Sequence, residues 1–437
     1  MNLSKPSSSS SAADAPGLLY AGFNQNFGCF AVGLDRGFRI YNCDPPKEKM
    51  RKDEDGGIAI VEMLFRCNYL ALVGGGKNPK YAPNKVIIWD DLKETPIVEM
   101  EFRNEVKNED LFISGLLIQP HIDCFRIVVV LHNKVFVYRF DATPEKLHTF
   151  ETIDNDKGLV ALSSSPSHAI LATPGRQKGH IQIIDLNTTH PITVSGNANG
   201  TPSTSLGQHR RSFSDHKTER VYGETTKIKG QRTGSNTTYM STSISFIPAH
   251  TNKLSCLALN EDGSKCASAS EKGTLIRVFD TASGKLLNEL RRGVDRAEIY
   301  SIAFSQDSRR LCVSSDKGTV HVFNLYADAE KGPGPVDNGK AHYGEVVVNN
   351  PVLAPSSGNR QSSLSFMKDL LPKYFSSEWS FAHFKITPDC RCICGFGQES
   401  HTIIVICADG TCYRYLFDER GGECARMSSE NFLKDQD

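Results

Sequence analysis

Short apolar stretches alternate with polar turns along most of the chain, and the apolar spacing of a helix is nearly absent. The apolar stretches are rich in β-branched and aromatic residues, and Gly, Asp and Asn separate them. Side chains that alternate between two faces are typical of strands. The pattern therefore predicts an all-β chain.

A short unit recurs within this pattern. It consists of a strand, a tight turn with an acidic residue and Gly, and a second strand that ends near an aromatic residue. The clearest copies are residues 33–42, 268–280, 313–325 and 406–418. Glycine supplies the positive φ that such a hairpin turn requires. The turn residues Gly273 and Gly318 are 45 positions apart, which is within the usual length of a four-stranded propeller blade.

Weaker units fit between these copies, and several blades must pack radially because one blade cannot bury both of its faces alone. We predict one seven-bladed β-propeller over residues 17–430, with a disordered N-terminus at 1–16 and a C-terminal tail at 431–437. The predicted blades are residues 17–56, 57–102, 103–155, 156–187, 247–292, 297–325 and 379–430.

Residues 188–246 interrupt the blade pattern. They are rich in Ser, Thr, Gly and Asn and almost free of large aliphatic residues, which predicts a disordered loop between blades four and five. The segment is basic between residues 209 and 233, where Arg211 stands three residues before Ser214. It is therefore either a basic loop tuned by phosphorylation or a solvated insertion without a role.

A second interruption, residues 326–378, falls in blade six or at its junction with blade seven. It begins polar and becomes apolar at residues 362–375. Leu364, Met367 and Leu371 have helical spacing there, although a helix would break or kink at Pro372. The composition leaves two interpretations open, a cover on the propeller or an element that meets a membrane interface.

Charge and cysteine content narrow the class of protein. The 50 basic and 50 acidic side chains balance, which argues against a nucleic-acid binder. We find no run of about 18 apolar residues and no signal-peptide pattern, so we expect neither a membrane span nor secretion. The 13 cysteines are odd in number and lie mostly in apolar runs, which predicts buried thiols in a reducing compartment.

Motifs for catalysis or metal binding are weak. Cys390, Cys392 and Cys394 would present three thiols on one face of a strand, but a zinc site usually pairs CxxC knuckles with a matching second pair. We therefore expect small buried side chains and no metal. Residues 74–77 lack the rest of a P-loop, and no GxSxG, HExxH or paired-carboxylate set occurs. These observations predict a protein that is not an enzyme and has no cofactor.

The most informative segment is residues 290–293, Leu-Arg-Arg-Gly. Consecutive strand side chains point to opposite sides, so Arg291 and Arg292 should serve two separate sites at an exposed strand edge. Hydroxyl and imidazole donors occur in the repeats on both sides, and with guanidinium they suit phosphate oxygens. They are Ser268, Ser270 and Thr274 before the pair, and Ser314, Ser315, Thr319 and His321 after it. The alternative is a solvated edge without a ligand.

Here the chain resembles a known family. The LRRG segment is similar to the [FL]-R-R-G hallmark of the PROPPINs, which are seven-bladed propellers that bind phosphoinositides. The similarity extends over nearly everything outside residues 188–246 and the termini. LPKYFSSEWSF and GGGKNPKY look like the third and fourth animal types of WD-repeat protein interacting with phosphoinositides, nearer the third.

The resemblance implies two headgroup pockets on the rim of blades five and six. The first would contain Arg291 with His250, Ser268, Ser270 and Thr274, and the second Arg292 with Ser315, Thr319 and His321. The implied ligands are phosphatidylinositol 3-phosphate and phosphatidylinositol 3,5-bisphosphate. A bound headgroup should raise the pKa of both histidines.

The resemblance also implies how such a protein works at a membrane. The long blade-six loop would insert through Phe366, Met367, Leu370 and Leu371. Partner contacts lie toward the first three blades, where Asn24 and Asn26 flank Gln25 and Asn26 replaces the Asp of the usual N-Q-D pattern. Residues 107–123 are longer than the family norm, and we assign them no function.

We therefore expect a monomeric phosphoinositide effector in autophagy. It would be cytoplasmic and peripheral on phagophore and endosomal or lysosomal membranes, and it would recruit a bridge-like lipid-transfer protein. The alternative is a cytosolic WD-repeat scaffold whose Arg pair serves a protein partner.

Overall fold

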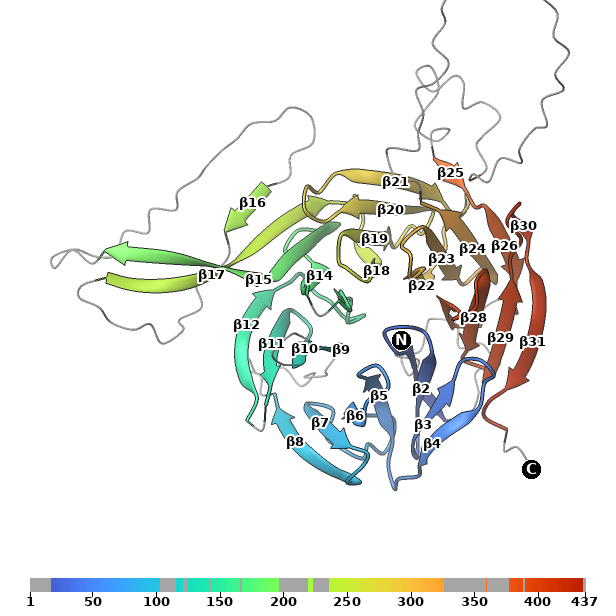
Figure 1. Cartoon of the computed structure of the whole chain (residues 1–437), viewed down its shortest axis with the longest axis horizontal. Coiled ribbons are helices and arrows are strands. Elements are labelled where there is room, and N and C mark those ends of the chain that lie inside the picture. Colours follow the sequence, from blue (N-terminus) through green and yellow to red (C-terminus); the bar gives the residue numbers. More distant parts are fainter. Residues whose placement is uncertain are drawn as a thin grey trace, which may run out of the picture.

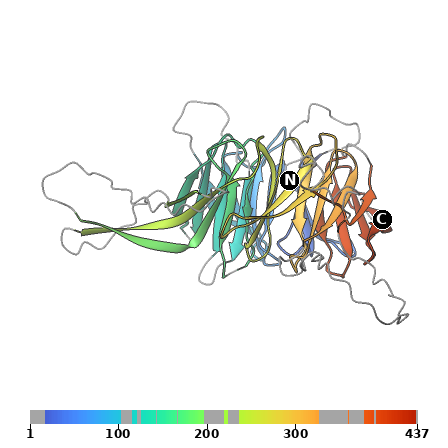
Figure 2. The same cartoon turned by 90° about the horizontal axis from the view of Figure 1, so that it is seen from above.

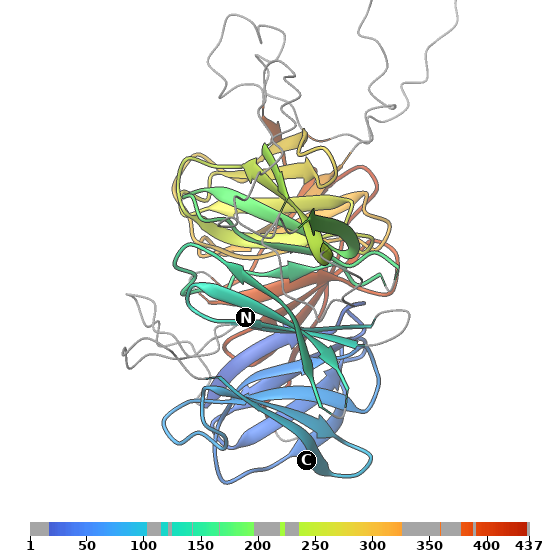
Figure 3. The ribbon, with the colours of Figure 1, turned by 90° about the vertical axis from the view of Figure 1, so that its left-hand side faces the viewer.

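Seven mainly antiparallel sheets surround a common axis in the computed structural model of this chain (Figure 1). The structure describes residues 17–102, 115–120, 125–141, 143–165, 167–195, 219–222, 236–325, 359, 377–387 and 390–434. Its regular elements in these ranges are strands, and no helix that could cross a membrane occurs among them. Seen from above and from the side, the sheets follow one another around a disc (Figure 2, Figure 3). The predicted seven-bladed all-β propeller is confirmed.

Blades one to three are regular meanders in which each strand pairs with the next. Blade one contains β1 (Leu18–Phe23), β2 (Cys29–Leu34), β3 (Gly37–Asn42) and β4 (Glu48–Lys52). Blade two contains β5 (Ile58–Met63), β6 (Tyr69–Gly74), β7 (Lys85–Asp90) and β8 (Thr95–Glu101). Blade three contains β9 (Gly115–Pro120), β10 (Phe125–Val130), β11 (Lys134–Phe140) and β12 (Glu145–Glu151). Part of the segment 107–123, to which we assigned no function, is therefore the first strand of blade three.

Blade four carries a long two-stranded extension. Its strands are β13 (Ala161–Leu162), β14 (Ile170–Pro174), β15 (His180–Ser195) and β17 (Asn236–Pro248), and β16 (Glu219–Tyr222) pairs with the outer side of β17. The pairing of β15 with β17 runs from His180 opposite Pro248 to Ser195 opposite Asn236. Figure 1 shows this ribbon leaving the disc.

The predicted position of the first interruption was wrong in one respect. Residues 188–195 and 236–246 lie in strands, and the segment connects the third and fourth strands of blade four instead of separating blades four and five. Poor apolar content did not exclude strands here, because main-chain groups satisfy one another across a ladder whatever the side chains are. Residues 196–218 and 223–235, with Arg211 and Ser214, lie outside the described part.

Blades five to seven complete the ring. Blade five contains β18 (Leu254–Leu259), β19 (Lys265–Ser270), β20 (Leu275–Asp280) and β21 (Leu286–Arg291), with β25 (Glu378–Trp379) parallel to β21. Blade six contains β22 (Ile299–Phe304), β23 (Arg310–Ser315), β24 (Thr319–Asn324) and β26 (Ala382–Lys385), with β30 (Gly422–Glu423) parallel to β26. Blade seven contains β27 (Cys392–Phe396), β28 (Thr402–Cys407), β29 (Thr411–Leu416) and β31 (Ala425–Asn431).

The second interruption therefore lies inside blade six, between its third and fourth strands. We predicted that blade seven begins at residue 379, but β26 pairs with β24 of blade six. We did not predict β26 as part of blade six, because its partner β24 lies far away in the sequence and the earlier repeats have short spacings. Phe366, Met367, Leu370 and Leu371 lie outside the described residues, so their predicted insertion stays a prediction.

The ring closes where the first and last blades meet. Phe30 stacks on Tyr41 with ring centroids 5.0 Å apart, and the Tyr41 hydroxyl donates to the main-chain oxygen of Phe432 at 2.9 Å. Buried apolar residues of blades one, six and seven form one cluster around this contact. Most of the cysteines in the described ranges are buried and all of them are free thiols, as predicted, while Cys67 is exposed. The closed ring holds the strand ends of blades five and six in fixed positions.

Candidate functional site

Arg291 and Arg292 are buried at the end of β21. Each side chain is 6% exposed, so the expected exposed strand edge is wrong. The reason is that β21 is not an edge, since β25 adds a parallel strand that places Trp379 opposite Arg291. A residue far along the chain therefore lies beside Arg291.

Arg292 is bound to the turn between β19 and β20. Its main-chain NH donates to the Thr274 oxygen at 3.0 Å, its Nε donates to the Gly273 oxygen at 3.0 Å, and its Nη2 donates to the Asp295 oxygen. Gly273 has φ +62°, and a Cβ there would lie 1.8 Å from the Ala297 oxygen. The hairpin turn thus requires glycine and presents a carbonyl to the guanidinium.

The charge of Arg292 has no carboxylate partner within ion-pair distance among the described residues. Burial lowers its pKa, and the negative charges of Asp316 and Asp295 act in the opposite direction. The adjacent surface is open, because a Cβ on Gly293 would meet no atom within 4 Å and Val294 is 60% exposed. A buried cation beside open space is suited to accept an anion.

Arg291 belongs to a different network, on blade five. Its Nη2 donates to the Ser377 hydroxyl at 3.3 Å, and that hydroxyl donates to Glu289 Oε1 at 3.1 Å. Glu289 Oε2 accepts from Arg277 Nε at 2.9 Å, and Arg277 Nη1 donates to the Ala249 oxygen at 2.6 Å. This chain of polar contacts orients Arg291.

The sequence analysis missed Arg277, Glu289 and Ser377. Ser268 lies opposite Arg277, and Arg277 lies opposite Glu289, so the three form one row across β19, β20 and β21. Arg277 alternates with the core residues of β20, which is a signal that the pattern contained. Ser377 gave no signal, because only the fold brings it beside Arg291.

The donors expected around Arg291 are less accessible than predicted. His250 Nε2 and the Ser268 hydroxyl lie 2.9 Å apart, and Ser268 is completely buried. Burial, and then the charge of Arg277, lower the pKa of His250 to about 4. Ser270 and Thr274 are also buried, and the main-chain oxygen of Ser270 accepts from Gly273 in the turn. Ser268 and His250 therefore support the pocket from within.

The donors expected around Arg292 lie on blade six. His321 Nδ1 is 3.2 Å from the Ser380 hydroxyl, and burial, then the charges of Arg292 and His383, lower the His321 pKa to about 4. The hydroxyl of Ser315 accepts from the main-chain NH of Lys317 at 3.4 Å, whereas Thr319 is partly exposed. Both histidines are thus neutral in the unliganded protein. We expect a bound headgroup to shift their pKa in the opposite direction, upward.

The two arginines therefore have separate neighbourhoods. Arg291 contacts Ser377 on blade five, whereas the charge of Arg292 acts on His321 and is influenced by Asp316 on blade six. Strand alternation leads us to expect such a separation, although Arg292 itself lies one residue beyond the end of β21.

The expected partner contacts lie on blade one. Asn24 is 2% exposed, and its side chain accepts from the Cys29 NH at 3.0 Å and donates to the Phe65 oxygen at 3.1 Å. Its side chain therefore joins blades one and two, and its predicted partner contact stays a prediction. Asn26 is partly exposed and stays a predicted contact.

Comparisons with known proteins agree with this architecture. The family model PROPPIN matches residues 229–433, a range that includes the Arg pair. SVP1-like protein 2 of Pichia angusta is 34% identical over 427 residues, which cover 96% of each chain. Autophagy-related protein 18e of Arabidopsis thaliana is 32% identical over 425 residues, which cover 96% of this chain and 89% of the relative.

A solved structure supports the fold independently. The crystal structure of Hsv2 from Kluyvelomyces marxianus has a TM-score of 0.62 at 21% identity, and the match covers 96% of this chain and 100% of that one. Relatives above 30% identity extend over almost the whole chain, and the LRRG segment lies at the end of β21 in blade five. The chain therefore belongs to the PROPPIN family, a family of autophagy-related β-propellers that bind phosphoinositides.

Proposed function

We propose that this chain binds phosphatidylinositol 3-phosphate and phosphatidylinositol 3,5-bisphosphate through two pockets that flank Arg291 and Arg292. The observation that carries the proposal is the Arg292 guanidinium, which is buried beside open space without a carboxylate partner among the described residues. A phosphate in that space would supply the missing negative charge. Membership in the PROPPIN family supports the same ligand class.

The chemistry of the pockets favours an anion over a neutral ligand. A guanidinium can donate two parallel hydrogen bonds to phosphate, and hydrogen bonds to charged groups contribute about 1.5 to 3 kcal/mol each. Neutral His321 and partly exposed Thr319 add donors on the blade-six side. Low exposure strengthens these interactions, because little water screens them.

Membrane binding would combine headgroup recognition with apolar insertion. The segment that contains Phe366, Met367, Leu370 and Leu371 lies in the sequence between β24 and β26, which pair in blade six. Blade six is also the blade that carries His321 and Asp316. Apolar side chains buried in the interface add affinity to the charge contacts, and stable peripheral binding usually takes two such signals.

The cellular role would follow from this recruitment. We infer that the protein is cytoplasmic and peripheral on phagophore and endosomal or lysosomal membranes. There it would recruit a bridge-like lipid-transfer protein, with Asn26 on blade one as a contact. The proposed lipid pockets lie on blades five and six, whereas Asn26 belongs to blade one.

Liposome flotation tests the proposal. Wild type should float with vesicles that contain either 3-phosphorylated inositide and should remain in the bottom fraction with vesicles that lack both lipids. Arg291→Thr combined with Arg292→Thr should abolish flotation, whereas Arg296→Thr, which removes an exposed neighbouring charge, should leave it unchanged. Because the pair is buried, urea unfolding must show that the double variant is folded. Wild type that fails to float with either lipid would favour the cytosolic scaffold instead.

A further inference from the structure

Several metal-binding side chains lie at one end of blade seven. Cys392 lies directly opposite Cys407 in the ladder of β27 and β28. The pairing continues, because the Ala408 NH donates to the Arg391 oxygen at 2.8 Å. Cys390 lies two residues before the start of β27, and Asp409 lies two residues after the end of β28, so both stand at the same end of this strand pair as Cys392 and Cys407. In the sequence the alternating cysteines have no second pair, but the fold supplies further donors from β28 and the turn after it.

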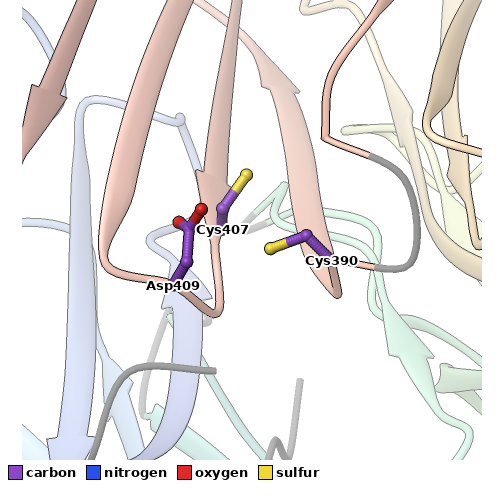
Figure 4. A group of neighbouring side chains, drawn as sticks. All are labelled: Cys390, Cys407 and Asp409. Carbon is purple, nitrogen blue, oxygen red and sulfur yellow. The ribbon is translucent and has the colours of Figure 1, made fainter. Parts of the chain in front are cut away.

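Three of these donors are already close together. The thiols of Cys390 and Cys407 and a carboxylate oxygen of Asp409 all lie within 4.8 Å of one another (Figure 4). Zinc binds sulfur at about 2.3 Å and carboxylate oxygen at about 2.0 to 2.2 Å, so two ligands of one zinc ion are roughly 3.5 to 4 Å apart. Small side-chain rotations would close the remaining gap.

The carboxylate is held in place by its own turn. Asp409 Oδ1 accepts from the Thr411 NH at 2.8 Å, which is an Asx turn that leads into β29. This bond orients Oδ2, the other oxygen, without occupying it. Asp409 is partly exposed, whereas both thiols are 1% exposed, so an ion could enter from the side of the carboxylate.

The two thiols come from different strand ends and are both buried. Cys390 precedes β27, and Cys407 is the last residue of β28. Thiolates are the form in which cysteine binds a metal, so metal binding would release the thiol protons.

We propose that Cys390, Cys407 and Asp409 bind a zinc ion, and that Cys392, which lies opposite Cys407 but is not among the donors within 4.8 Å of one another, rotates inward to become the fourth ligand. Zinc accepts thiolate together with carboxylate in a tetrahedral arrangement, whereas calcium and magnesium require oxygen ligands. Four protein ligands leave no open position, so the role is structural. The ion would tie β27 to the turn after β28 in the blade that closes the ring.

Cobalt substitution tests the site on the full chain. Protein that is reduced with a phosphine and stripped with EDTA should bind one equivalent of Co²⁺, with the absorption bands of tetrahedral cobalt and of sulfur-to-cobalt charge transfer. One equivalent of Zn²⁺ should then remove these bands. Cys390→Ser should lose most of the charge-transfer absorption, and Cys392→Ser should reduce it. Cys266→Ala, which changes a buried thiol on blade five, should keep the full spectrum.

A milder variant tests metal binding in a protein that should keep its fold. Asp409→Asn keeps the Asx turn, because an amide oxygen also accepts from the Thr411 NH, but it removes the charged ligand. It should fold like wild type and bind Co²⁺ at least about tenfold more weakly. The proposal is overturned if reduced wild type binds no stoichiometric Co²⁺, or if Asp409→Asn and Cys390→Ser keep the wild-type spectrum. A Cys390–Cys407 disulfide in protein that binds no cobalt after reduction would overturn it in favour of a redox pair.

Discussion

The Nε of Arg292 donates a hydrogen bond to the main-chain oxygen of Gly273 at 3.0 Å. This contact joins the end of β21 to the hairpin turn between β19 and β20. The turn holds Gly273 in a left-handed conformation, with φ +62°, against the Ala297 oxygen. The repeat glycine that identifies a blade is therefore also a part of the proposed lipid site.

We expect Gly273→Ala to weaken both the fold and lipid binding. A Cβ at this position would meet the Ala297 oxygen at 1.8 Å, and the left-handed conformation costs a non-glycine residue about 1 to 2 kcal/mol before any clash. Urea unfolding should show a loss of at least about 2 kcal/mol, and flotation should fall because the Gly273 carbonyl shifts away from Arg292.

Gly293→Ala is the matched control for that change. A Cβ there would meet no atom within 4 Å, and the residue does not have a positive φ. Its unfolding free energy should stay within about 0.5 kcal/mol of wild type. Equal losses in the two variants would mean that the turn does not depend on the close approach at Gly273.

Single replacements of the two arginines should affect different pockets. Arg291→Thr should remove the contact to Ser377, and Arg292→Thr should remove the contacts to the Gly273 and Asp295 oxygens. Each variant should retain one pocket for a soluble inositol headgroup. Flotation should nevertheless fall by far more than half in each, because two sites on one rigid body bind a membrane with avidity. Titration that finds two headgroup sites in either single variant would contradict the separation.

The order of blades and the Arg pair could be predicted from the sequence, because both depend on local signals. Strand alternation, turn glycines and the separation of Arg291 from Arg292 are properties of neighbouring residues. The positions of β17 and β26 could not be predicted, since each pairs across a long insertion with a strand far back in the chain.

Burial of the site was unpredictable for the same reason. Ser377 and Trp379 reach Arg291 from beyond residue 376, and no local pattern specifies that approach. Cys407 and Asp409 likewise meet Cys390 only through the register of β27 and β28. Contacts between distant segments place two arginines that we expected at an exposed edge in a buried position. They also bring Cys390, one of the three alternating cysteines, into a cluster with Cys407 and Asp409.

The blade-six segment should contribute membrane affinity but not headgroup affinity. Replacing Phe366, Met367, Leu370 and Leu371 by Ser or Asp removes apolar area, and area burial contributes about 25 cal/mol per Å². Flotation should decrease strongly, while calorimetric titration with a soluble inositol headgroup should be unchanged. An equal decrease in both measurements would mean that the segment shapes the pockets.

Glu62 should make the fold less stable as the pH rises. Burial raises its pKa to about 7, and the hydrogen bond from the Tyr20 hydroxyl acts in the opposite direction. The folded chain then holds a proton that the unfolded chain releases near pH 4.5, so stability is highest below that value and is lost as the pH rises through about 7.

Glu62→Gln should remove this dependence. Between pH 4.5 and 7.5, ionisation of Glu62 should reduce the unfolding free energy of wild type by up to about 3 kcal/mol, as measured by urea unfolding. This contribution should be absent from the variant. Glu99→Gln, which changes a more exposed carboxylate, is the control. Parallel pH profiles for wild type and Glu62→Gln would show that Glu62 is ionised in the fold across this range.

The pH dependence of lipid binding should not come from the histidines between pH 7.5 and 6. In the unliganded protein burial lowers the pKa of His250 and of His321 to about 4. A bound phosphate raises these values, so protonation strengthens binding only as the pH falls from the bound-state pKa toward 4. The second pKa of the lipid phosphate is near 6, and its protonation weakens binding over the same fall in pH. Wild-type flotation should therefore decrease from pH 7.5 to 6, and flotation of His250→Gln and His321→Gln should decrease in parallel with it.

Below about pH 5.5 wild type should retain more binding than His321→Gln, because only wild type gains a cation beside the headgroup. A gain in wild type between pH 7.5 and 6 that His321→Gln lacks would mean that the bound phosphate raises the His321 pKa by about two units, and that this imidazole contacts the headgroup as a cation at neutral pH.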